Sequence, residues 1–447
     1  MKIKYFHFKN DTSPCKCGKI HKKTDIKVYI GKNAVNSIIE VLKDFNVKKP
    51  LIIAKESFLK YDGNGPKASG VIVRELLENE GVEYATYTFP DSMVKCDEHT
   101  AGSAFIKFNT SCDCIIGIGS GVINDIGKLL SSRTKLPYII VGTAPSMDGY
   151  ASATSSLEVD GLKTHVRSKS PDVIIGDTDI LKTAPDIMVC AGFGDLLAKY
   201  TSLAEWKISN IITGEHYCED IAQLERSALD KCTAGVQGLA KREDEAIEDL
   251  FEALIRSGVA MNILGNSRPA SGTEHCMSHV WDIRGLVFGT PVAPHGIQCA
   301  ITTVISSKMY EKLKDLTPDR EKALASVASF DNEKWNKHLE EFIGKGSKVM
   351  IEAGKKNPRY DVESHKARLE VIIENWDKIV SIIKEEIPSS KHIEELLDLI
   401  NCPKDMTQIG LDQEILPDTF RAAADIRDKY VLSRLTFDLG ITDELLK

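Results

Sequence analysis

The sequence predicts an α/β amino-terminal domain built on a parallel sheet, followed by an all-α carboxyl-terminal domain. Short β-branched runs alternate with amphipathic helical stretches through the first 180 residues, as in repeated βαβ units. From about Thr183 the strand patterns fade and long helical patterns replace them. The chain has 447 residues, more than one ordinary core accommodates, which favours two or three domains.

The expected elements follow in chain order. The strands of the sheet are predicted at 27–30, 50–54, 83–89, 114–119, 137–142 and 172–177. Two short runs flanking Asp160-Gly161 predict a β-hairpin, because this dipeptide favours the tight turn. Helices are predicted at 35–45, 70–80, 194–210, 220–240, 246–264, 271–288, 295–314, 331–353, 364–386 and 393–399. We therefore divide the chain into an α/β domain, 1–180, and a helical domain, 181–447.

Composition narrows the class of protein. Hydrophobic residues make up 42% and charged residues 27%, as in globular proteins. Apolar runs fall short of the roughly 18–20 residues that span a bilayer, and the first residues lack a signal-peptide pattern. The net charge of −8 disfavours a general nucleic-acid binder. Eleven cysteines, an odd number, suit reduced thiols in a cytoplasm. We expect a cytoplasmic enzyme without a nucleic-acid partner or membrane insertion.

A glycine-rich loop follows the predicted strand at 114–119. Gly119, Ser120 and Gly121 stand where the strand turns into a helix, so backbone N–H groups can approach a pyrophosphate. This is a Rossmann-like feature, but the G-x-G-x-x-G pattern fails because residue 122 is valine. A tight turn without a ligand is an equally plausible interpretation of the loop alone.

A second loop, VGTAPSMDGYASA at 141–153, follows the next predicted strand. Ligands of α/β sheets bind at the carboxyl ends of such strands. Asp148 is the only acid in this loop, which makes it a candidate for holding a substrate hydroxyl. The alternative is an ordinary turn capped by the aspartate.

The strongest pattern for chemistry lies in the helical part. His275 and His279 are four residues apart and share one face of a helix, and His295 begins the next helical segment. Asp195 lies on the helix that opens this domain. One carboxylate with two or three imidazoles suits Zn²⁺, Fe²⁺ or Ni²⁺ acting as a Lewis acid. A structural role for the histidines is the alternative.

Near the amino terminus, Cys15, Cys17 and His21 form a C-x-C-G-x-x-H pattern that could supply three zinc ligands. A surface turn carrying reduced thiols is the preferred interpretation, since the sequence indicates no fourth ligand. The G-x-S-x-G motif is missing, which argues against an α/β-hydrolase.

Taken in order, GIGSGVINDIGK, VGTAPSMDGYASA, GFGDLLAKY, SGTEHCMSH and PHG resemble the superfamily of glycerol dehydrogenases, iron-containing alcohol dehydrogenases and dehydroquinate synthases. The second of these segments, with SRPASGTEH, is most similar to the sn-glycerol-1-phosphate dehydrogenase family, including its bacterial branch. The resemblance implies a dehydroquinate synthase-like fold, a cleft between the domains, NAD(H) or NADP(H), and one divalent metal ion, Zn, Ni or Fe. It also implies a homodimer or higher homo-oligomer.

The resemblance further implies roles for individual residues. The metal ligands would be Asp195, His275 and His295, with His279 as a proton relay and Asp148 on the substrate hydroxyls. The cofactor would contact residues of the two loops: Gly119, Ser120, Gly121, Asp125, Thr143, Ser146 and Ser152. We assign the substrate phosphate to Arg268, with Lys199 behind it, because guanidinium groups suit phosphate oxygens.

The implied reaction is the interconversion of dihydroxyacetone phosphate and sn-glycerol 1-phosphate by hydride transfer at C2. Two alternatives stay open. One is a dehydrogenase of another polyol, polyol phosphate or phosphonate aldehyde with the same machinery. The other is a lyase like dehydroquinate synthase, which typically carries a glutamate where this chain has Asp195.

Overall fold

A computed structural model describes residues 3–10, 13–60, 67–91, 95–356 and 360–446. Packing divides the chain into two compact units: Met1–Phe193 with Ser227–Asn266, and Gly194–Arg226 with Ser267–Lys447. The predicted boundary at 180 differs because the helix over 244–264 packs against the loop around Asp148. The predicted division into an α/β domain, 1–180, and a helical domain, 181–447, stays a prediction.

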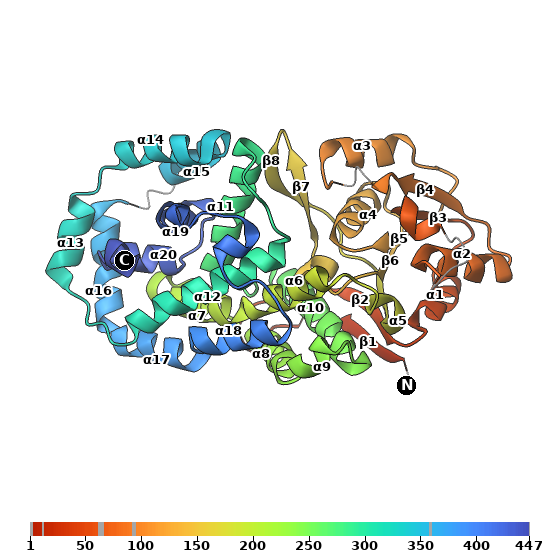
Figure 1. Ribbon diagram of the computed structural model, residues 1–447, viewed down its shortest axis with the longest axis horizontal. Coiled ribbons are helices and arrows are strands. Elements are labelled where there is room, and N and C mark those ends of the chain that lie inside the picture. The colour runs from red at the N-terminus through yellow and green to blue at the C-terminus, as the bar shows by residue number, and fades with distance from the viewer. Residues whose placement is uncertain (1–2, 11–12, 61–66, 92–94, 357–359, 447) are drawn as a thin grey trace. The chain divides into compact units, whose positions relative to one another are not determined.

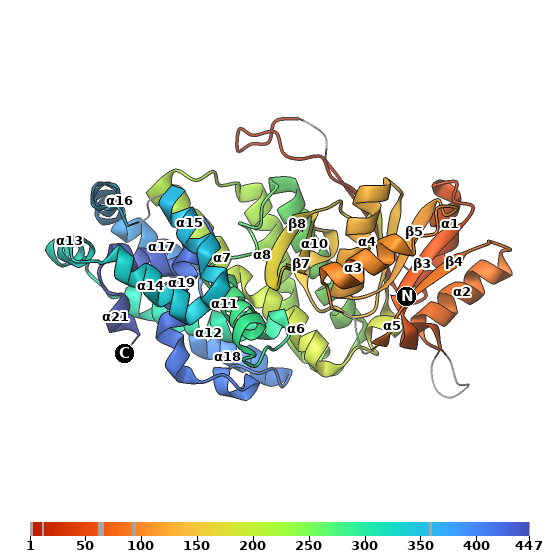
Figure 2. The ribbon, with the colours of Figure 1, turned by 90° about the horizontal axis from the view of Figure 1, so that it is seen from above.

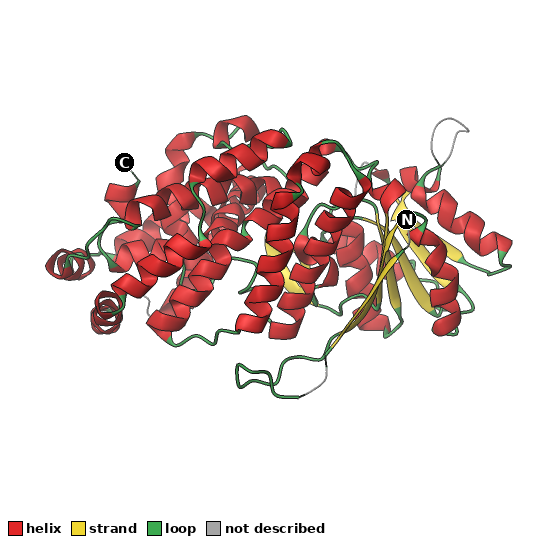
Figure 3. Ribbon diagram, turned by 90° about the horizontal axis from the view of Figure 1, so that it is seen from below, coloured by secondary structure: helices red, strands yellow, loops and turns green. Residues whose placement is uncertain are grey.

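The first unit contains a seven-stranded sheet, six strands of which the sequence predicts, and every strand among the described residues belongs to this unit (Figure 3). The strand order is β1-β2-β9-β6-β5-β3-β4, and all neighbours except β1 and β2 are parallel. The strands are β1 (Lys4–Lys9), β2 (Asp25–Gly31), β3 (Pro50–Lys55), β4 (Ala85–Phe89), β5 (Cys114–Gly119), β6 (Tyr138–Gly142) and β9 (Val173–Asp177).

Strand β1 was not predicted. Its sequence, KYFHFK, alternates polar and aromatic residues at the edge of the sheet and shows no buried run. It pairs antiparallel with β2, and Phe6 and Phe8 lie under the Arg256 guanidinium at 5.5 Å from each ring centroid. The predicted hairpin is confirmed as β7 (Thr154–Val159) and β8 (Leu162–Arg167), with Asp160 and Gly161 both at positive φ.

Helices cover both faces of the sheet (Figures 1 and 2). On one face, α1 (Ser37–Asp44) and α2 (Ser69–Asn79) bury apolar side chains against the β-branched residues of the strands. On the other, α4 (Gly121–Thr134) packs against β5 and β6, and Phe251 of α10 (Asp244–Leu264) reaches Gly142 and Gly176. The remaining helices of this unit are α3 (Glu98–Ile106), α5 (Thr178–Leu181) and α9 (Val236–Ala240).

The topology places one loop at a favoured binding position. The chain runs from β3 outward to β4 and then returns to the other side of β3 as β5, so strand order reverses between β3 and β5. Ligands of open α/β sheets bind at the carboxyl ends of strands beside such a switch point. The Gly119–Gly121 turn directly follows β5 and therefore lies beside this position.

The second unit is helical among its described residues. It contains α7 (Lys199–Thr213), α11 (Thr273–Phe288), α12 (His295–Leu313), α13 (Arg320–Ala328), α14 (Asn332–Ile343), α15 (Ser347–Lys356), α16 (Val362–Glu374), α17 (Trp376–Glu386), α18 (Ser390–Leu399), α19 (Leu416–Ile426), α20 (Leu432–Asp438) and α21 (Thr442–Leu445). Two helices, α6 (Asp186–Leu197) and α8 (Glu219–Ala234), begin in one unit and end in the other.

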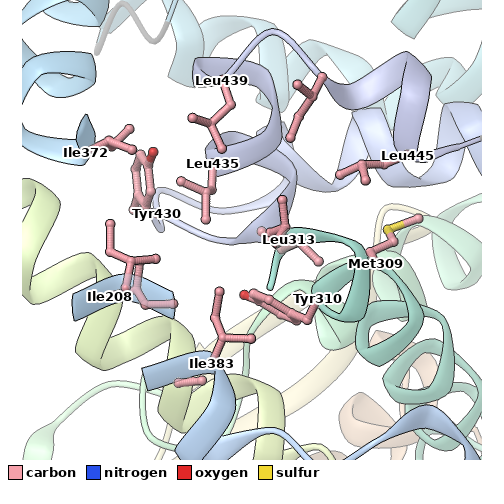
Figure 4. Close-up of a cluster of buried hydrophobic side chains, with 14 of the residues drawn as sticks. Ile208, Met309, Tyr310, Leu313, Ile372, Ile383, Tyr430, Leu435, Leu439 and Leu445 are labelled. Atoms are coloured by element: carbon pink, nitrogen blue, oxygen red, sulfur yellow. The ribbon is translucent and has the colours of Figure 1, made fainter. Parts of the chain in front are cut away.

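Apolar side chains from widely separated helices form the core of this unit (Figure 4). Ile208 of α7, Leu313 of α12 and Ile383 of α17 meet residues of the carboxyl-terminal segment, including Leu435 and Leu439. The segment after residue 400, whose sequence carries no interpretable motif, thus supplies core residues rather than a tail.

Some helix boundaries differ from prediction. The segment predicted as one helix over 364–386 is interrupted at Asn375, and the 331–353 segment is interrupted at Gly344, which adopts φ +69°.

A stretch at Asp186–Thr213 is long and apolar enough to cross a bilayer, but 83% of its most apolar window is buried within the protein, as in a core helix.

Candidate functional site

Four metal-type donors gather in the second unit. They come from Asp195 on α6, His275 on α11, and His295 and Cys299 one turn apart on α12, and one donor atom of each lies within 4.8 Å of all the others. His275 Nε2 is 3.3 Å from Asp195 Oδ1, and Cys299 Sγ is 3.7 Å from His295 Nε2. The geometry brings together the three predicted ligands and adds a thiol.

A glycine contact lets α6 approach the beginning of α12. A Cβ atom at Gly194 would lie 2.3 Å from the carbonyl oxygen of Gly296, so no larger residue fits at this crossing. Asp195 follows Gly194 and His295 precedes Gly296. The glycine in the GFGD segment therefore explains how the carboxylate reaches the imidazole.

Buried acceptors orient His275. Its Nδ1 lies 2.9 Å from Glu274 Oε1, which also accepts from the backbone N–H of Gly272 at 2.6 Å. The other oxygen, Glu274 Oε2, accepts from the Thr201 hydroxyl at 2.6 Å. A carboxylate behind one ring nitrogen fixes the imidazole so that the other nitrogen can bind a metal ion.

His295 has a comparable support made of neutral groups. Its Nδ1 lies 3.0 Å from the Ser278 hydroxyl oxygen, and that hydroxyl donates to Gln298 Oε1 at 3.3 Å. The amide of Gln298 donates to Asp282 at 3.0 Å. The ring nitrogen that lies near Cys299 is again the one left for a ligand.

The surroundings of the cluster act in opposite directions on its carboxyl group and its thiol. Burial alone would raise the pKa of Asp195, but the hydrogen bond with His275 and the charges of Lys199 and His295 hold this pKa below its usual range. Burial raises the pKa of the Cys299 thiol to about 11. The thiol is therefore protonated at neutral pH until a metal ion replaces its proton.

His279 lies beside the cluster rather than in it. Its ring stacks on that of His295, with centroids 5.4 Å apart and planes inclined by 13°, and its Nδ1 is 3.7 Å from Asp282 Oδ2. The side chain is 12% exposed, so solvent reaches it. A partly exposed imidazole next to a ligand ring suits the predicted proton relay.

Arg268 and Lys199, predicted to bind phosphate, are engaged within the fold. The Arg268 guanidinium donates to Glu215 at 3.0 Å and to the carbonyl oxygens of Glu205 at 3.0 Å and Tyr430 at 2.6 Å. Lys199 Nζ donates to the carbonyl oxygen of Asp195 at 3.0 Å. Because the Arg268 and Lys199 side chains are buried, these contacts favour a positioning role.

The predicted cofactor loop of the first unit begins at the end of β5. Ser120 precedes α4 and Gly121 is its first residue, so the amino terminus of a 14-residue helix opens at the switch point. A Cβ atom at Gly127 would lie 2.3 Å from the Tyr138 hydroxyl oxygen. Gly127 therefore permits the close helix–strand packing that the third glycine of G-x-G-x-x-G otherwise provides.

A buried lysine joins the two predicted cofactor loops. Lys128 Nζ forms an ion pair with Asp125 at 2.8 Å and donates to Ser152 Oγ at 3.2 Å and to the carbonyl oxygens of Gly149 at 3.1 Å and Thr154 at 2.6 Å. Lys128 thus links Asp125, on its own helix α4, to Ser152 in the second predicted cofactor loop.

The other predicted residues of this unit lie along the second loop. Thr143 N–H donates to the carbonyl oxygen of Gly119 at 3.1 Å, and Ser146 N–H donates to Ala144 at 3.0 Å. Asp148 accepts from the Ser257 hydroxyl at 3.1 Å. This contact leaves both the substrate-binding and the capping interpretation of Asp148 as predictions.

Sequence reasoning missed several of these residues. Cys299 follows His295 by four positions, the spacing that puts two side chains on one helix face. Glu274 is adjacent to His275, where only its mismatch with H-E-x-x-H was considered. Lys128 is the last residue of the glycine-rich motif. Three of the residues it contacts, Gly149, Ser152 and Thr154, lie more than twenty positions away.

Comparison with known proteins identifies the class of enzyme fold to which this chain is similar. Residues 29–185 match the family model described as iron-containing alcohol dehydrogenase. An archaeal halo-thermophilic alcohol dehydrogenase from a Red Sea brine pool aligns over 100% of both chains, with a TM-score of 0.59 at 14% identity. Maleylacetate reductase from Rhizobium aligns over 94% of this chain and 96% of its own, with a TM-score of 0.58 at 13% identity. The fold is that of the iron-containing alcohol dehydrogenase class.

Sequence relatives narrow the class further. A protein of Bacillus licheniformis named glycerol-1-phosphate dehydrogenase [NAD(P)+] is 35% identical over 69% of this chain and 76% of its own length. One of Halalkalibacterium halodurans with the same name is 28% identical over 95% of both chains, and one of Pyrococcus horikoshii is 31% identical over 65% and 81%. The chain belongs to the glycerol-1-phosphate dehydrogenase family.

Proposed function

We propose that this protein is a metal-dependent oxidoreductase that interconverts dihydroxyacetone phosphate and sn-glycerol 1-phosphate with NAD(H) or NADP(H). The observation that carries the proposal is the convergence of Asp195, His275 and His295, with Glu274 behind His275. The names of the relatives supply the substrate and the cofactor class.

The donor set fits one divalent cation. A carboxylate and two imidazoles are typical ligands of zinc, iron and nickel, and the nearby Cys299 thiol favours these over magnesium. When bound, such an ion acts as a Lewis acid that stabilises negative charge on an alkoxide oxygen. We therefore propose Zn²⁺, Ni²⁺ or Fe²⁺ held by Asp195, His275 and His295.

The chain's own residues complete the chemistry. Asp148, held by Ser257, would accept hydrogen bonds from substrate hydroxyls. His279, partly exposed and stacked on His295, would pass a proton between the substrate oxygen and solvent. Glu274 would keep His275 in one tautomer throughout the reaction.

The nicotinamide cofactor would bind to the loops of the first unit. The amino terminus of α4 offers backbone N–H groups to a pyrophosphate, around Gly119, Ser120 and Gly121. Lys128 fixes the neighbouring loop through Asp125 and Ser152, while Thr143 and Ser146 border it. A nicotinamide cofactor held there would supply or accept the hydride exchanged at substrate C2.

Phosphate recognition by Arg268, with Lys199, stays a prediction. One variant, assayed with a phosphorylated and an unphosphorylated substrate, can test it. If Arg268 binds the phosphate, Arg268→Lys raises KM for dihydroxyacetone phosphate but not for unphosphorylated dihydroxyacetone. If Arg268 instead holds Glu215 and Tyr430 in place, both substrates lose activity equally and the melting temperature falls.

The reaction is tested by incubating metal-stripped protein with dihydroxyacetone phosphate and NADH or NADPH, adding Zn²⁺, Ni²⁺, Fe²⁺ or Mg²⁺ in turn. We expect metal-dependent loss of the reduced cofactor, with the sn-1 phosphate as product. Turnover of unphosphorylated polyols or phosphonate aldehydes alone would contradict the substrate assignment. Inactivity with every one of these substrates would favour the lyase alternative.

For setting and assembly, we propose a cytoplasmic enzyme that acts as a homodimer or higher homo-oligomer, without a nucleic-acid partner. All eleven cysteines are free thiols in the structure, which supports the proposal of a reducing compartment. Light scattering of the purified protein measures the mass of the assembly directly.

A further inference from the structure

The connection between β1 and β2 carries the C-x-C-G-x-x-H pattern, which the proposed function does not use. In its described part the N–H of Gly18 donates to the carbonyl oxygen of Cys15 at 2.8 Å, and the N–H of Cys15 donates to that of Lys19 at 2.9 Å. Gly18 adopts φ +81°, and Pro14 bridges to Ile20. These contacts fold the motif into a small closed turn.

The turn brings its three soft donors together. The Sγ atoms of Cys15 and Cys17 and one ring nitrogen of His21 lie within 4.8 Å of one another, and Cys17 Sγ is 3.4 Å from His21 Nε2. Among residues 13–23, these three side chains are partly buried and the other eight residues are exposed. The donors therefore converge while the lysines between them point to solvent.

The segment lacks an apolar core of its own. Ile20 is the only large aliphatic residue of 13–23, and it is 65% exposed. The base of the loop is anchored, since Lys22 N–H donates to the carbonyl oxygen of Ile263 at 3.0 Å and Asn10 bonds to both Lys22 and Thr24. Figure 2 shows the loop projecting from the first unit. Loops longer than about 12–15 residues are uncommon in compact domains, and functional loops are one of the main classes among them.

We propose that Cys15, Cys17 and His21 bind a structural zinc ion. Two thiolates and an imidazole are three of the four ligands of common tetrahedral zinc sites, and such sites hold segments too small for a hydrophobic core. Zinc binding displaces the two thiol protons to solvent and changes no oxidation state. This site does not depend on the proposed dehydrogenase activity.

The first test counts metal. Full-length protein is loaded with Zn²⁺, desalted, and analysed by mass spectrometry for zinc per chain. We expect Cys15→Ser/Cys17→Ser to hold one zinc fewer than wild type, and the matched control Cys96→Ser/Cys112→Ser to hold the same amount. His275→Ala empties the other cluster, so the two losses should add in the combined variant. Unchanged zinc content in Cys15→Ser/Cys17→Ser would overturn the proposal.

A second test keeps the proposal falsifiable if a variant folds poorly. His21→Cys offers zinc a third thiolate and should retain the metal, whereas His21→Ala should lose it. In wild type, a chelator should increase tryptic cleavage within the loop, at Lys16, Lys19, Lys22 and Lys23, and added Zn²⁺ should restore protection. A Cys15–Cys17 disulfide, seen as two fewer titratable thiols in zinc-free protein prepared without oxidant, would contradict a zinc site.

Discussion

Two clusters of metal-type donors in this protein are built in different ways. Cys15, Cys17 and His21 come from seven consecutive positions, and a turn of their own backbone brings them together. Asp195, His275 and His295 come from three helices spread over about a hundred positions, and α6 meets α12 at the Gly194 contact. The first three donors lie in one short segment, which we call the local turn. The second three come from distant segments that only the fold brings together, and we call them the dispersed cluster.

The difference extends to what surrounds the donors. The dispersed cluster is held by a buried layer of side chains, in which Glu274 supports His275 and Ser278 supports His295. The local turn relies on main-chain hydrogen bonds and is flanked by exposed residues. A rigid, buried setting suits a catalytic metal ion, whereas in an exposed turn a metal ion would serve to stabilise the local structure.

The largest effect should follow removal of a dispersed ligand. His275→Ala should lower kcat/KM for dihydroxyacetone phosphate roughly a thousandfold, because a Lewis acid supplies several kcal/mol and each 1.36 kcal/mol is tenfold. The measurement is the initial rate of NADH oxidation with saturating metal. His21→Ala, its counterpart in the turn, should leave that rate within about twofold of wild type, and a comparable loss there would erase the distinction between the clusters.

The supporting layer should have an intermediate effect. Glu274→Gln removes the carboxylate behind His275, and we expect metal affinity to fall about 10- to 100-fold. Competition with a chromophoric chelator measures the dissociation constant. Glu225→Gln, a change at another fully buried acid of the same unit, serves as the control. Equal affinity in Glu274→Gln and wild type would show that this layer does not tune the metal.

Cys299 tests whether a thiolate binds the metal ion of the dispersed cluster, as thiolates are proposed to do in the local turn. Cys299→Ser should shift the preference for Zn²⁺ over Mg²⁺ by about tenfold, since a thiolate favours softer ions. Cobalt-loaded protein should lose a sulfur-to-metal charge-transfer band, recorded in the Cys15→Ser/Cys17→Ser background so that only one site contributes. Cys402→Ser, also a buried thiol, should retain the band.

The sequence predicted the two kinds of site unequally, for a physical reason. Strand runs, the hairpin turn and the glycine loop depend on neighbouring residues, so the parallel sheet and the Gly119–Gly121 turn were correctly placed. Strand β1 and the helices after residue 400 were missed because only tertiary packing stabilises them. The Lys128 contacts and the surroundings of Arg268 join distant segments, so no local pattern reveals them.

The last prediction concerns folding stability rather than activity or metal binding, and it tests the electrostatic cost of burying acids near the dispersed cluster. Glu205 is buried near Glu274, and burial together with the charge of Glu274 raises the pKa of Glu205 to about 7. In an unfolded chain the pKa of this carboxyl would be near 4.5, the ordinary value for glutamate. The folded state therefore binds more protons between these values, so its stability should fall as pH rises from about 4.5 to 7.

Glu205→Gln should remove this part of the pH dependence, at most about 3 kcal/mol at 1.36 kcal/mol per pKa unit. The measurement is the urea midpoint of wild type and variant at pH 5 and pH 7.5, where the difference between the two proteins must change with pH. A Glu205→Gln profile that also parallels wild type would mean that Glu205 titrates at its ordinary pKa, and that the carboxylates behind His275 carry no electrostatic penalty.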